Sequence, residues 1–568
     1  MAHTALIAAG IILSLLYQLY RWALPKPIPG IPYNKESAGR LLGDVPSLVA
    51  DIKRRGDVFL WFRDQNLQSG SVINQVFTNL LGKPVVIVAD ARETRDILVH
   101  RSADFDRTVF VSNLLRPIIG QGQITFPTGP AWKARRRLSQ DTMSARFLKN
   151  VAAPNIHSSC AVFVRLWEEK ARLAAGRPFD AETDLFHATL DAVTVFTFGS
   201  QYPYRAVRPR LEALAALSAG DVERGPRADD PAVFPRCEID TELQNIIDFI
   251  ERAEAVQSMG LQDLGWYFET MTGRYRTLKR AKDECVRREV SRALERMKAL
   301  DERTAEETAR HGVDLIVNRE RIMAGKENRQ PDYFGEAVRG EVFGAIVGGH
   351  DTSSSTMCWA VKLLSREQAT QTALRRALQS AYAAALEERR QPTVEEVLDT
   401  PLPYLDATIE ELFRTCAVVP MNSRQATRDT EVLGRPIPKG TVVMHLSAGP
   451  GFTMPSYPVD DKLRHSSGGK EAAAWADDDV EAFRPERWLV DGAERCDPNA
   501  GPSNGFGMGI RSCFGKRLAY MSFRLLLVSV VWKFEMLECP EELSSPLGKF
   551  GVVYKPQQTY VRLRKVAL

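Results

Sequence analysis

The chain has 568 residues, of which 44% are hydrophobic and 26% are charged, a composition that is ordinary for a globular protein with a large core. The formal net charge of +4 is too small to indicate a nucleic-acid-binding protein. The eight cysteines are scattered and form no Cys-x-x-Cys pair, which indicates neither a disulfide framework nor a zinc site and fits a reducing compartment.

Residues 1–24 predict a membrane anchor. The run from Thr4 to Tyr20 is apolar apart from three polar residues, and roughly 20 such residues span a bilayer as a helix. Arg21 and Lys26 follow the run and no Lys or Arg precedes it, which predicts that the rest of the chain lies on the cytoplasmic side. A cleaved signal peptide is the alternative, but its basic first segment and its small-residue cleavage site are both missing.

Residues 25–39 predict a stiff hinge, because four prolines fall between Pro25 and Pro32 and favour an extended chain. Residues 40–568 contain no segment with the composition of a domain boundary. We therefore expect a single catalytic domain over residues 40–568, behind one transmembrane helix.

Helical patterns outnumber strand patterns in this body. A strand is predicted at 84–89, a helix at 91–100, a helix at 181–200, a loop at 220–236, helices at 239–257 and 275–310, and a polar break at 324–331. Helices are then predicted at about 332–365, 366–389 and 404–416, strand-like pieces at 429–446, a loop insertion at 449–478, and a last helix from Cys513 to about Phe534. The predicted fold class is mainly α with small β-sheets.

The first chemical motif in chain order is a W-x-x-x-R spacing formed by Trp132 and Arg136. Residues at this spacing lie on one face of a helix, so we expect the two side chains to be neighbours. The adjacent cations Lys133, Arg135 and Arg137 are explained equally well as solvated surface or as a docking face for an acidic protein.

A second motif, Gly348-Gly349-His350-Asp351-Thr352-Ser353, falls inside a long helical pattern. Each glycine costs about 1 kcal/mol relative to alanine in a helix, so helix formation alone explains the run poorly. The glycines let a ligand approach the backbone, and a hydroxyl that bonds a backbone carbonyl can open the helix. The alternative is a kinked helix packed close to a neighbour, and His350 is expected to be a satisfied polar residue.

Glu411 and Arg414 are three residues apart, which places them on one side of a helix. Alone, this spacing is most often a surface salt bridge of small energy. The run Phe483–Trp488 follows downstream and contains Arg487, a second arginine that can share the same carboxylate.

The last motif, Phe506–Gly515, has the pattern F-x-x-G-x-R-x-C-x-G and precedes an apolar helical pattern. A cysteine enclosed by glycines predicts a thiolate held in a tight loop by backbone N–H groups. Such a thiolate is either a nucleophile or a metal ligand. The alternative is a buried cysteine beside a glycine-rich turn, which is the usual state of a free cysteine.

Together and in this order, the four motifs resemble the cytochrome P450 family over nearly the whole chain. The resemblance implies the P450 fold and a heme b cofactor with Cys513 as the axial thiolate ligand, which favours O–O cleavage. It implies propionate contacts from Trp132, Arg136, Arg511 and, at a position that often serves this end, Arg424. Phe506 and Gly349 are expected to border the heme as well.

The resemblance also implies roles for catalytic residues and for residues that support them. Thr352 and Asp351 are implied as the catalytic pair that delivers protons to oxygen, with Asp351 leading to solvent. Glu411, Arg414 and Arg487 are implied as a buried structural triad that locks the loop carrying the thiolate.

The implied function is a monooxygenase that inserts one oxygen atom of O2 into an apolar small molecule. Its electrons come from NADPH through NADPH-cytochrome P450 reductase, with cytochrome b5 as a possible second donor, and no nucleic acid is involved. The anchor, the hinge and the 449–478 insertion resemble fungal members of secondary metabolism, in the endoplasmic reticulum membrane with the catalytic domain on the cytoplasmic side. An apolar pocket is predicted around Phe110, Leu114, Ile118 and Phe126, although these positions also suit plain core.

Other functions stay open at this point. A heme-thiolate isomerase or coupling enzyme needs no external electrons, and a heme sensor needs no turnover, but the pair Asp351–Thr352 favours oxygen activation. A cysteine hydrolase using Cys513 lacks a convincing histidine partner, since the nearest, His465, falls in a predicted loop.

Overall fold

The computed structural model describes residues 2–465, 474–476 and 478–567. The chain forms two compact units, each assembled from segments that are distant in the sequence. The first unit comprises Met1–Thr108, Val419–Ala482 and Gly501–Ser512, and the second comprises Val109–Val418, Phe483–Ala500 and Cys513–Leu568. The boundary between them passes between Ser512 and Cys513, so the cysteine motif contributes to both units.

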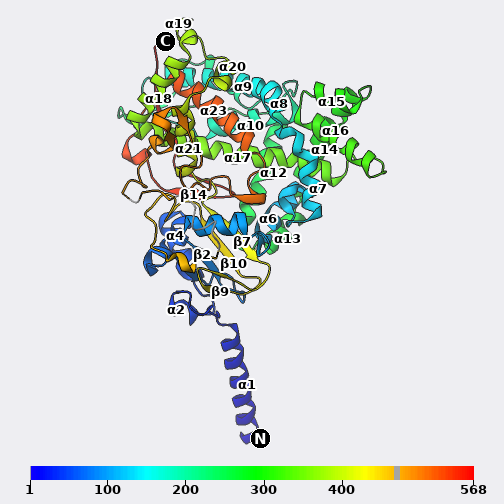
Figure 1. Ribbon diagram of the computed structural model, residues 1–568, viewed down its shortest axis with the longest axis vertical. Helices are drawn as coiled ribbons and strands as arrows, with labels where there is room; N and C mark the ends of the chain where they lie inside the picture. The colour runs from blue at the N-terminus through cyan, green and yellow to red at the C-terminus, as the bar shows by residue number, and fades with distance from the viewer. Residues whose placement is uncertain (1, 466–473, 477, 568) are drawn as a thin grey trace. The chain divides into compact units, whose positions relative to one another are not determined.

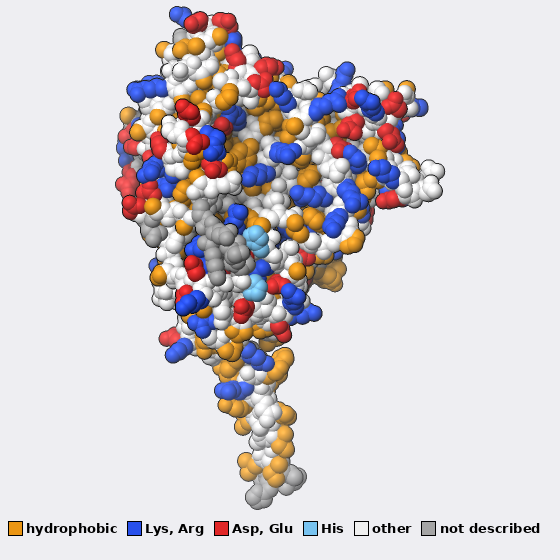
Figure 2. Space-filling model, in the orientation of Figure 1, with side chains coloured by type: hydrophobic (Ala, Val, Ile, Leu, Met, Phe, Trp, Pro, Cys, Tyr) orange, Lys and Arg blue, Asp and Glu red, His pale blue; other side chains and the backbone are white. Residues whose placement is uncertain are grey.

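The first unit begins with the long helix α1 (Ala2–Ala23), which projects away from the strands of this unit (Figure 1). Its stretch Leu6–Ala23 is apolar and long enough to cross a membrane, and none of it is buried. Figure 2 shows hydrophobic side chains along the helix. The helix expected from residues 4–20 is therefore present, with its apolar surface outward.

A five-stranded sheet in the order β1-β2-β10-β7-β3 organises the first unit. β2 pairs antiparallel with β1 and parallel with β10, and β7 lies between β10 and β3. All four residues of β2 are β-branched and buried, as expected for a strand covered on both faces. The strands are β1 (Ile73–Val76), β2 (Val85–Val88), β3 (Phe105–Arg107), β7 (Met421–Ala426) and β10 (Val442–Leu446).

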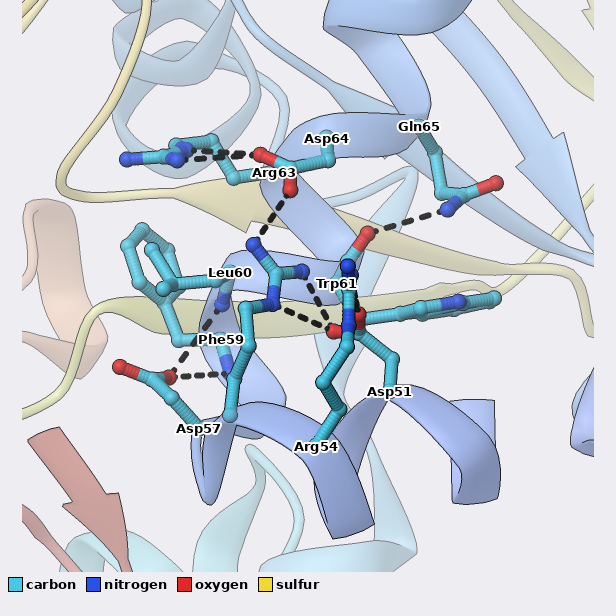
Figure 3. A network of polar contacts seen from close by, with 10 residues as sticks. Asp51, Arg54, Asp57, Phe59, Leu60, Trp61, Arg63, Asp64 and Gln65 are labelled. Atoms are coloured by element: carbon cyan, nitrogen blue, oxygen red, sulfur yellow. Dashed lines mark hydrogen bonds and ion pairs between the residues drawn. The ribbon is translucent and has the colours of Figure 1, made fainter. Parts of the chain in front are cut away.

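Two short helices of this unit, α3 (Val45–Arg55) and α4 (Val58–Ser69), are joined by an arginine network (Figure 3). Arg55 donates from Nε to Asp51 Oδ2 at 2.8 Å and from Nη1 to Asp64 Oδ2 at 2.7 Å. Because Asp51 and Asp64 belong to different helices, one guanidinium group fixes the angle between them.

The second unit is built around α17 (Glu336–Arg366), which packs along α10 (Glu182–Phe198) and lies centrally among the helices of this unit (Figure 1). Its core includes Leu190, Val342 and Ile346, which are fully buried. The other long helices are α6 (Val109–Ile119), α7 (Pro130–Ser139), α9 (Ala153–Ala174), α12 (Thr241–Ser258), α14 (Gly273–Met297), α16 (Gly312–Lys326), α21 (Pro403–Thr415) and α23 (Lys516–Lys533).

Small sheets complete the second unit. β16 (Tyr560–Lys565) lies between β13 (Phe534–Leu537) and β4 (Phe179–Asp180), and β14 (Gly548–Phe550) pairs with β15 (Tyr554–Pro556) as a hairpin. β15 packs against α17. The prediction of a mainly α chain with small sheets is confirmed.

The structure corrects several predicted boundaries. The helix expected at 275–310 is two helices, because the Asp301 side chain caps a new start at α15 (Glu302–Thr308). The expected 366–389 helix is likewise divided into α18 (Gln368–Ala381) and α19 (Ala383–Glu387).

Several elements were not predicted, and one helix and one small sheet of the second unit are examples. The helix α13 (Gln262–Met271) follows α12, and a two-stranded sheet of β5 (Glu223–Arg224) and β6 (Ala232–Val233) lies in the expected loop 220–236. Part of the predicted 449–478 insertion, residues 466–473 and 477, lies outside the described residues.

Candidate functional site

Cys513 is the first residue of the last segment of the second unit, and it lies three residues before the start of α23. It is the one exposed cysteine of the eight, while four are buried and three are partly buried. Burial raises the pKa of Cys160, Cys285 and Cys358 to about 12. Those thiols stay protonated near neutral pH, so Cys513 is the cysteine best placed to act as a thiolate ligand.

Trp132 and Arg136, both on α7, lie close to this cysteine. The Arg136 guanidinium carbon is 5.5 Å from the Trp132 ring centroid and 5.1 Å from that of Phe514, the residue after Cys513. Burial lowers the pKa of Arg136, and the charge of Cys513 opposes that shift. The second unit therefore brings the W-x-x-x-R pair and the cysteine together, with a cation beside the thiolate.

Arg136 and Arg424 form no ion pair with a carboxylate among the described residues. Arg424 lies on β7 in the first unit, is 5% exposed, and donates from Nη1 to Asn422 Oδ1 at 2.7 Å. Burial and then the charge of Arg107 lower its pKa to about 10. A buried guanidinium without an anion is unfavourable, so both arginines fit the carboxylates of a heme.

The remaining part of the cysteine motif belongs to the first unit. Gly509 has a φ of 68°, and a Cβ at this position would lie 2.1 Å from the carbonyl oxygen of Leu98. The short helix η9 (Gly509–Arg511) packs against the π-helix η1 (Asp96–His100). Phe506, Arg511 and Arg424 thus lie in the unit that does not contain Cys513, and their contacts with heme stay predictions.

The glycine-rich motif lies within α17, which is helical from Glu336 to Arg366. Thr352 Oγ1 donates to the carbonyl oxygen of Gly348 at 2.8 Å. A Cβ on Gly349 would come within 2.9 Å of Val193 Cγ2 on α10, whereas a Cβ on Gly348 would meet nothing within 4 Å. Gly349 therefore serves close helix packing, and Gly348 is the glycine that borders open space.

Asp351 follows on the same helix. Burial raises the pKa of its carboxyl to about 6, Lys555 lowers it, and Glu254, Glu182 and Glu251 raise it further. A group with a pKa near the working pH both accepts and releases protons, which suits the predicted proton role.

His350 is buried between α17 and α10, and it meets the expectation of a satisfied polar residue at Nε2 but not at Nδ1, which has no hydrogen-bond partner among the described residues. Its Nε2 lies 3.1 Å from the carbonyl oxygen of Phe186, and its ring packs edge-on against the Phe186 ring. Burial lowers the pKa of His350 to about 3, so the ring is neutral near pH 7.

The expected triad is formed within the second unit. Arg414 donates from Nε to Glu411 Oε2 at 2.8 Å and from Nη2 to Oε1 at 2.7 Å, and Arg487 donates from Nε to Oε1 at 3.2 Å. Trp488 Nε1 adds a bond to Glu411 Oε2 at 2.9 Å. Glu411 is fully buried, so the alternative of a surface salt bridge is wrong.

Several polar residues near α17 were missed from the sequence. Glu341 is buried and accepts hydrogen bonds from Ser139 Oγ at 2.6 Å and from Gln123 Nε2 at 3.0 Å. Lys555 and Glu182 influence Asp351 from β15 and α10. No local spacing in the sequence connects these residues, since each pair is more than a hundred positions apart.

The predicted substrate pocket is only partly consistent with the structure. Leu114 and Ile118 are buried in the hydrophobic core of the second unit, so they are core residues. Phe110 is 51% exposed. The Arg135 guanidinium carbon lies 5.7 Å from the ring centroid of Phe126.

Comparison with known proteins agrees with this geometry. The family model described as "Cytochrome P450" matches residues 73–449 and 466–563. The cytochrome P450 monooxygenase TRI13 of Fusarium sporotrichioides is 36% identical, over 97% of this chain and 98% of the relative. The cytochrome P450 monooxygenase xilC of Penicillium crustosum is 34% identical, over 98% of this chain and 95% of the relative.

A solved structure has the same fold. The crystal structure of the cytochrome P450DA heme domain superposes with a TM-score of 0.66 at 19% identity, covering 96% of this chain and 99% of that chain. At that identity the likeness concerns the fold alone.

Proposed function

The chain belongs to the cytochrome P450 family and is a heme-thiolate monooxygenase, and from this premise we propose how its own residues divide the work. Bound heme supplies the one-electron and O2 chemistry, which no amino-acid side chain provides. Cys513 would supply the thiolate ligand of the heme iron, Arg136 and Trp132 would hold a propionate, and Arg424 and Arg511 would be further propionate contacts. Arg136 and Arg424 form no ion pair with a carboxylate among the described residues, which supports this assignment.

Thr352 and Asp351 are proposed as the proton-handling pair. The Thr352 hydroxyl donates to Gly348, which leaves its oxygen free to accept a second hydrogen bond on the side of the open space at Gly348. Asp351 has a carboxyl whose pKa of about 6 lets it exchange protons near neutral pH. Thr352 thus orients a proton donor, and Asp351 replenishes it.

The substrate is a small molecule, and the enzyme depends on a redox partner, as its family does. We infer an apolar substrate from a fungal secondary-metabolite pathway, because the similar proteins named above come from fungi.

We propose NADPH-cytochrome P450 reductase as the electron donor, with cytochrome b5 as a second donor. Exposed cations on α7 and α23 support an acidic partner: Lys133, Arg137, Lys516 and Arg517. We place the enzyme in the endoplasmic reticulum membrane, held by α1 with the two units on the cytoplasmic side, because Arg21 and Lys26 follow the apolar stretch.

The observation that carries the proposal is the exposed Cys513 beside an arginine that has no carboxylate partner. Substitution Cys513→Ala should abolish the red-shifted absorption band of the reduced, CO-bound enzyme. Cys237→Ala is the matched control, since Cys237 is also partly accessible and should leave the band intact. A normal band in Cys513→Ala would refute the ligand assignment.

An isomerase, a coupling enzyme and a heme sensor would all give the same band, so turnover separates them. With a reconstituted reductase, we expect oxygen and NADPH consumption that rises with substrate. Product formed without NADPH would favour the isomerase, and binding without consumption would favour the sensor.

A further inference from the structure

Glu341 on α17 joins three segments of the second unit through one carboxylate. Its Oε1 accepts a hydrogen bond from the backbone N–H of Gln123 at 2.5 Å, and its Oε2 accepts bonds from Gln123 Nε2 at 3.0 Å and from Ser139 Oγ at 2.6 Å. Gln123 begins the short helix η2 (Gln123–Thr125), and Ser139 is the last residue of α7. The side chain therefore ties α17 both to the loop before α7 and to the end of α7.

These hydrogen bonds lie away from water. Glu341 and Ser139 are each only 4% exposed. Burial raises the pKa of Glu341 above its usual value, against the hydrogen bonds from Ser139 and Gln123, which lower it. Loss of one of these bonds would leave a buried polar atom unsatisfied, so the three residues are held in one arrangement.

Two glycines let the loop approach α17 closely enough for these bonds. A Cβ on Gly340 would lie 2.6 Å from Gly122 N, and a Cβ on Gly122 would lie 2.9 Å from Gly340 O. Both clashes are with backbone atoms, so neither glycine can be replaced unless the loop or the helix moves. Thr125 closes the loop, because its Oγ1 donates to Gly122 O at 2.9 Å. The loop and α17 thus cross at a single close distance beside Glu341.

The same loop holds α7 at a second point. Arg135 on α7 donates from Nε to the Gln121 carbonyl oxygen at 3.1 Å and from Nη2 to Gln121 Oε1 at 3.1 Å. Ser139 is the first attachment point and Arg135 is the second. Arg136 lies between them in the chain, on a helix that can neither slide nor rotate without breaking one of the two attachments.

The face of α7 that carries Arg136 also carries Ser139. Trp132, Arg136 and Ser139 follow one another at spacings of four and three residues, which places them along one side of the helix. Along this face, the Arg136 guanidinium carbon reaches 5.1 Å from the ring centroid of Phe514, the residue after Cys513. The face that approaches the cysteine therefore ends at the serine that Glu341 holds.

We propose that Glu341 is a positioning residue for the heme-propionate site: through Ser139 and the loop of Gln121 and Gln123 it fixes α7, and with it the place of Arg136. The inference rests on the propionate role proposed above for Arg136. A guanidinium group meets a carboxylate in a defined geometry only when the helix that carries it is itself held by buried bonds. One helix, α17, would then support both the propionate contact and the proton-handling pair.

The test uses the full-length holoenzyme with Glu341→Gln, which keeps the size of the side chain and one acceptor oxygen. The first readout is hydrogen–deuterium exchange of the α7 amides, which measures how firmly the helix is attached. We expect exchange in residues 130–139 to be about tenfold faster, equivalent to about 1.4 kcal/mol in the free energy of local opening. Ser139→Ala removes one donor and leaves the bonds from Gln123, so its effect should be smaller.

The second readout is the resonance Raman band of heme propionate bending, which responds to hydrogen bonds at the propionates. Arg136→Gln shows the direction in which the band shifts when the guanidinium group is lost. Glu341→Gln should shift the band in the same direction. The double variant should shift it no further than Arg136→Gln alone, because Glu341 acts through Arg136.

Asp191→Asn is the matched control, because Asp191 on α10 is another buried carboxylate that joins two segments of the second unit. It accepts hydrogen bonds from the backbone N–H groups of Ala206 at 2.7 Å and Val207 at 3.0 Å, at the start of α11 (Val207–Ala215). We expect this variant to lower the melting temperature and leave the propionate band in place. An unchanged band in Glu341→Gln, or an equal shift in Asp191→Asn, would overturn the proposal.

Arg136→Gln separates this inference from the proposed function. If Arg136→Gln leaves the propionate band unchanged, the propionate role of Arg136 fails and the inference falls with it. If Arg136→Gln shifts the band but Glu341→Gln does not, the inference alone fails. Faster exchange of α7 in Glu341→Gln with an unshifted band would mean that the carboxylate stabilises α7 without positioning Arg136.

Discussion

At the cysteine loop, one glycine meets a steric requirement that no other residue can meet. Gly509 combines a left-handed φ of 68° with a backbone approach that leaves no room for a Cβ, since one would lie 2.1 Å from Leu98 O. The motif position is therefore glycine for a reason that lies in the fold of the first unit, and the neighbouring Arg511 depends on that close approach for its place.

Substitution Gly509→Ala should displace the loop from the η1 helix, because strain of about 1–3 kcal/mol adds to a direct clash with the backbone. We expect less heme retained per protein and a lower melting temperature, measured by absorbance and by thermal unfolding. Gly325→Ala in α16 is the control, since a Cβ there meets nothing within 4 Å. Heme content equal to that of the wild type in Gly509→Ala would contradict this account.

At the scale of elements, Glu411 links the helix α21 to the segment that contains Arg487 and Trp488. Its two carboxylate oxygens accept bonds from two arginines, an indole and the backbone N–H of Arg484 at 2.8 Å. Because the group is fully buried, its charge is balanced only by these partners. The segment is thus fixed to α21 by one side chain.

Substitution Glu411→Gln should destabilise the second unit by about 3–5 kcal/mol, because it removes a buried carboxylate charge that two buried guanidinium groups share. The free energy of unfolding in urea measures the effect. Glu307→Gln is the matched control, since Glu307 pairs with Arg303 at 3.1 Å on the surface and should change stability by less than about 1 kcal/mol. Equal losses in the two variants would rule out a special role for burial.

At the scale of the whole molecule, α1 exposes an apolar surface, whereas the long helices of the second unit bury theirs. Leu6, Leu13 and Ile7 are each more than 60% exposed. Such a surface is stable in a bilayer, which removes it from water.

Deletion of residues 2–24 should release much of the protein from membranes, because it removes the helix that spans the apolar layer. Fractionation of cells, followed by alkaline extraction of the membranes, measures this. Leu13→Arg should weaken membrane retention, since a charge at the centre of a span costs about 2.5–3.5 kcal/mol, whereas Gln18→Arg near its end should be tolerated. A mature N-terminus near residue 25 would instead identify α1 as a cleaved signal.

The motifs could be found in the sequence because each depends on short spacing. Trp132 with Arg136 and Glu411 with Arg414 sit on single helices, and the helical repeat fixes their neighbourhood without any tertiary knowledge. The α1 helix and the β2 strand were predictable for the same reason, since composition and periodicity are local properties.

Other features needed the tertiary structure. Whether Gly348 or Gly349 borders open space depends on Val193, which lies on another helix, and the division of 275–310 depends on a cap at Asp301. The ion pair of Lys555 with Glu182 joins β15 to α10, which only chain folding brings together.

The sequence by itself determined the family and the mainly helical class and predicted the thiolate ligand, because these follow from residues a few positions apart. The tertiary structure decided which glycine packs against a neighbouring helix and that Arg136 and Arg424 form no ion pair with a described carboxylate. Burial and charge at a given atom are set by all the neighbours that folding gathers around it, and no local pattern records them.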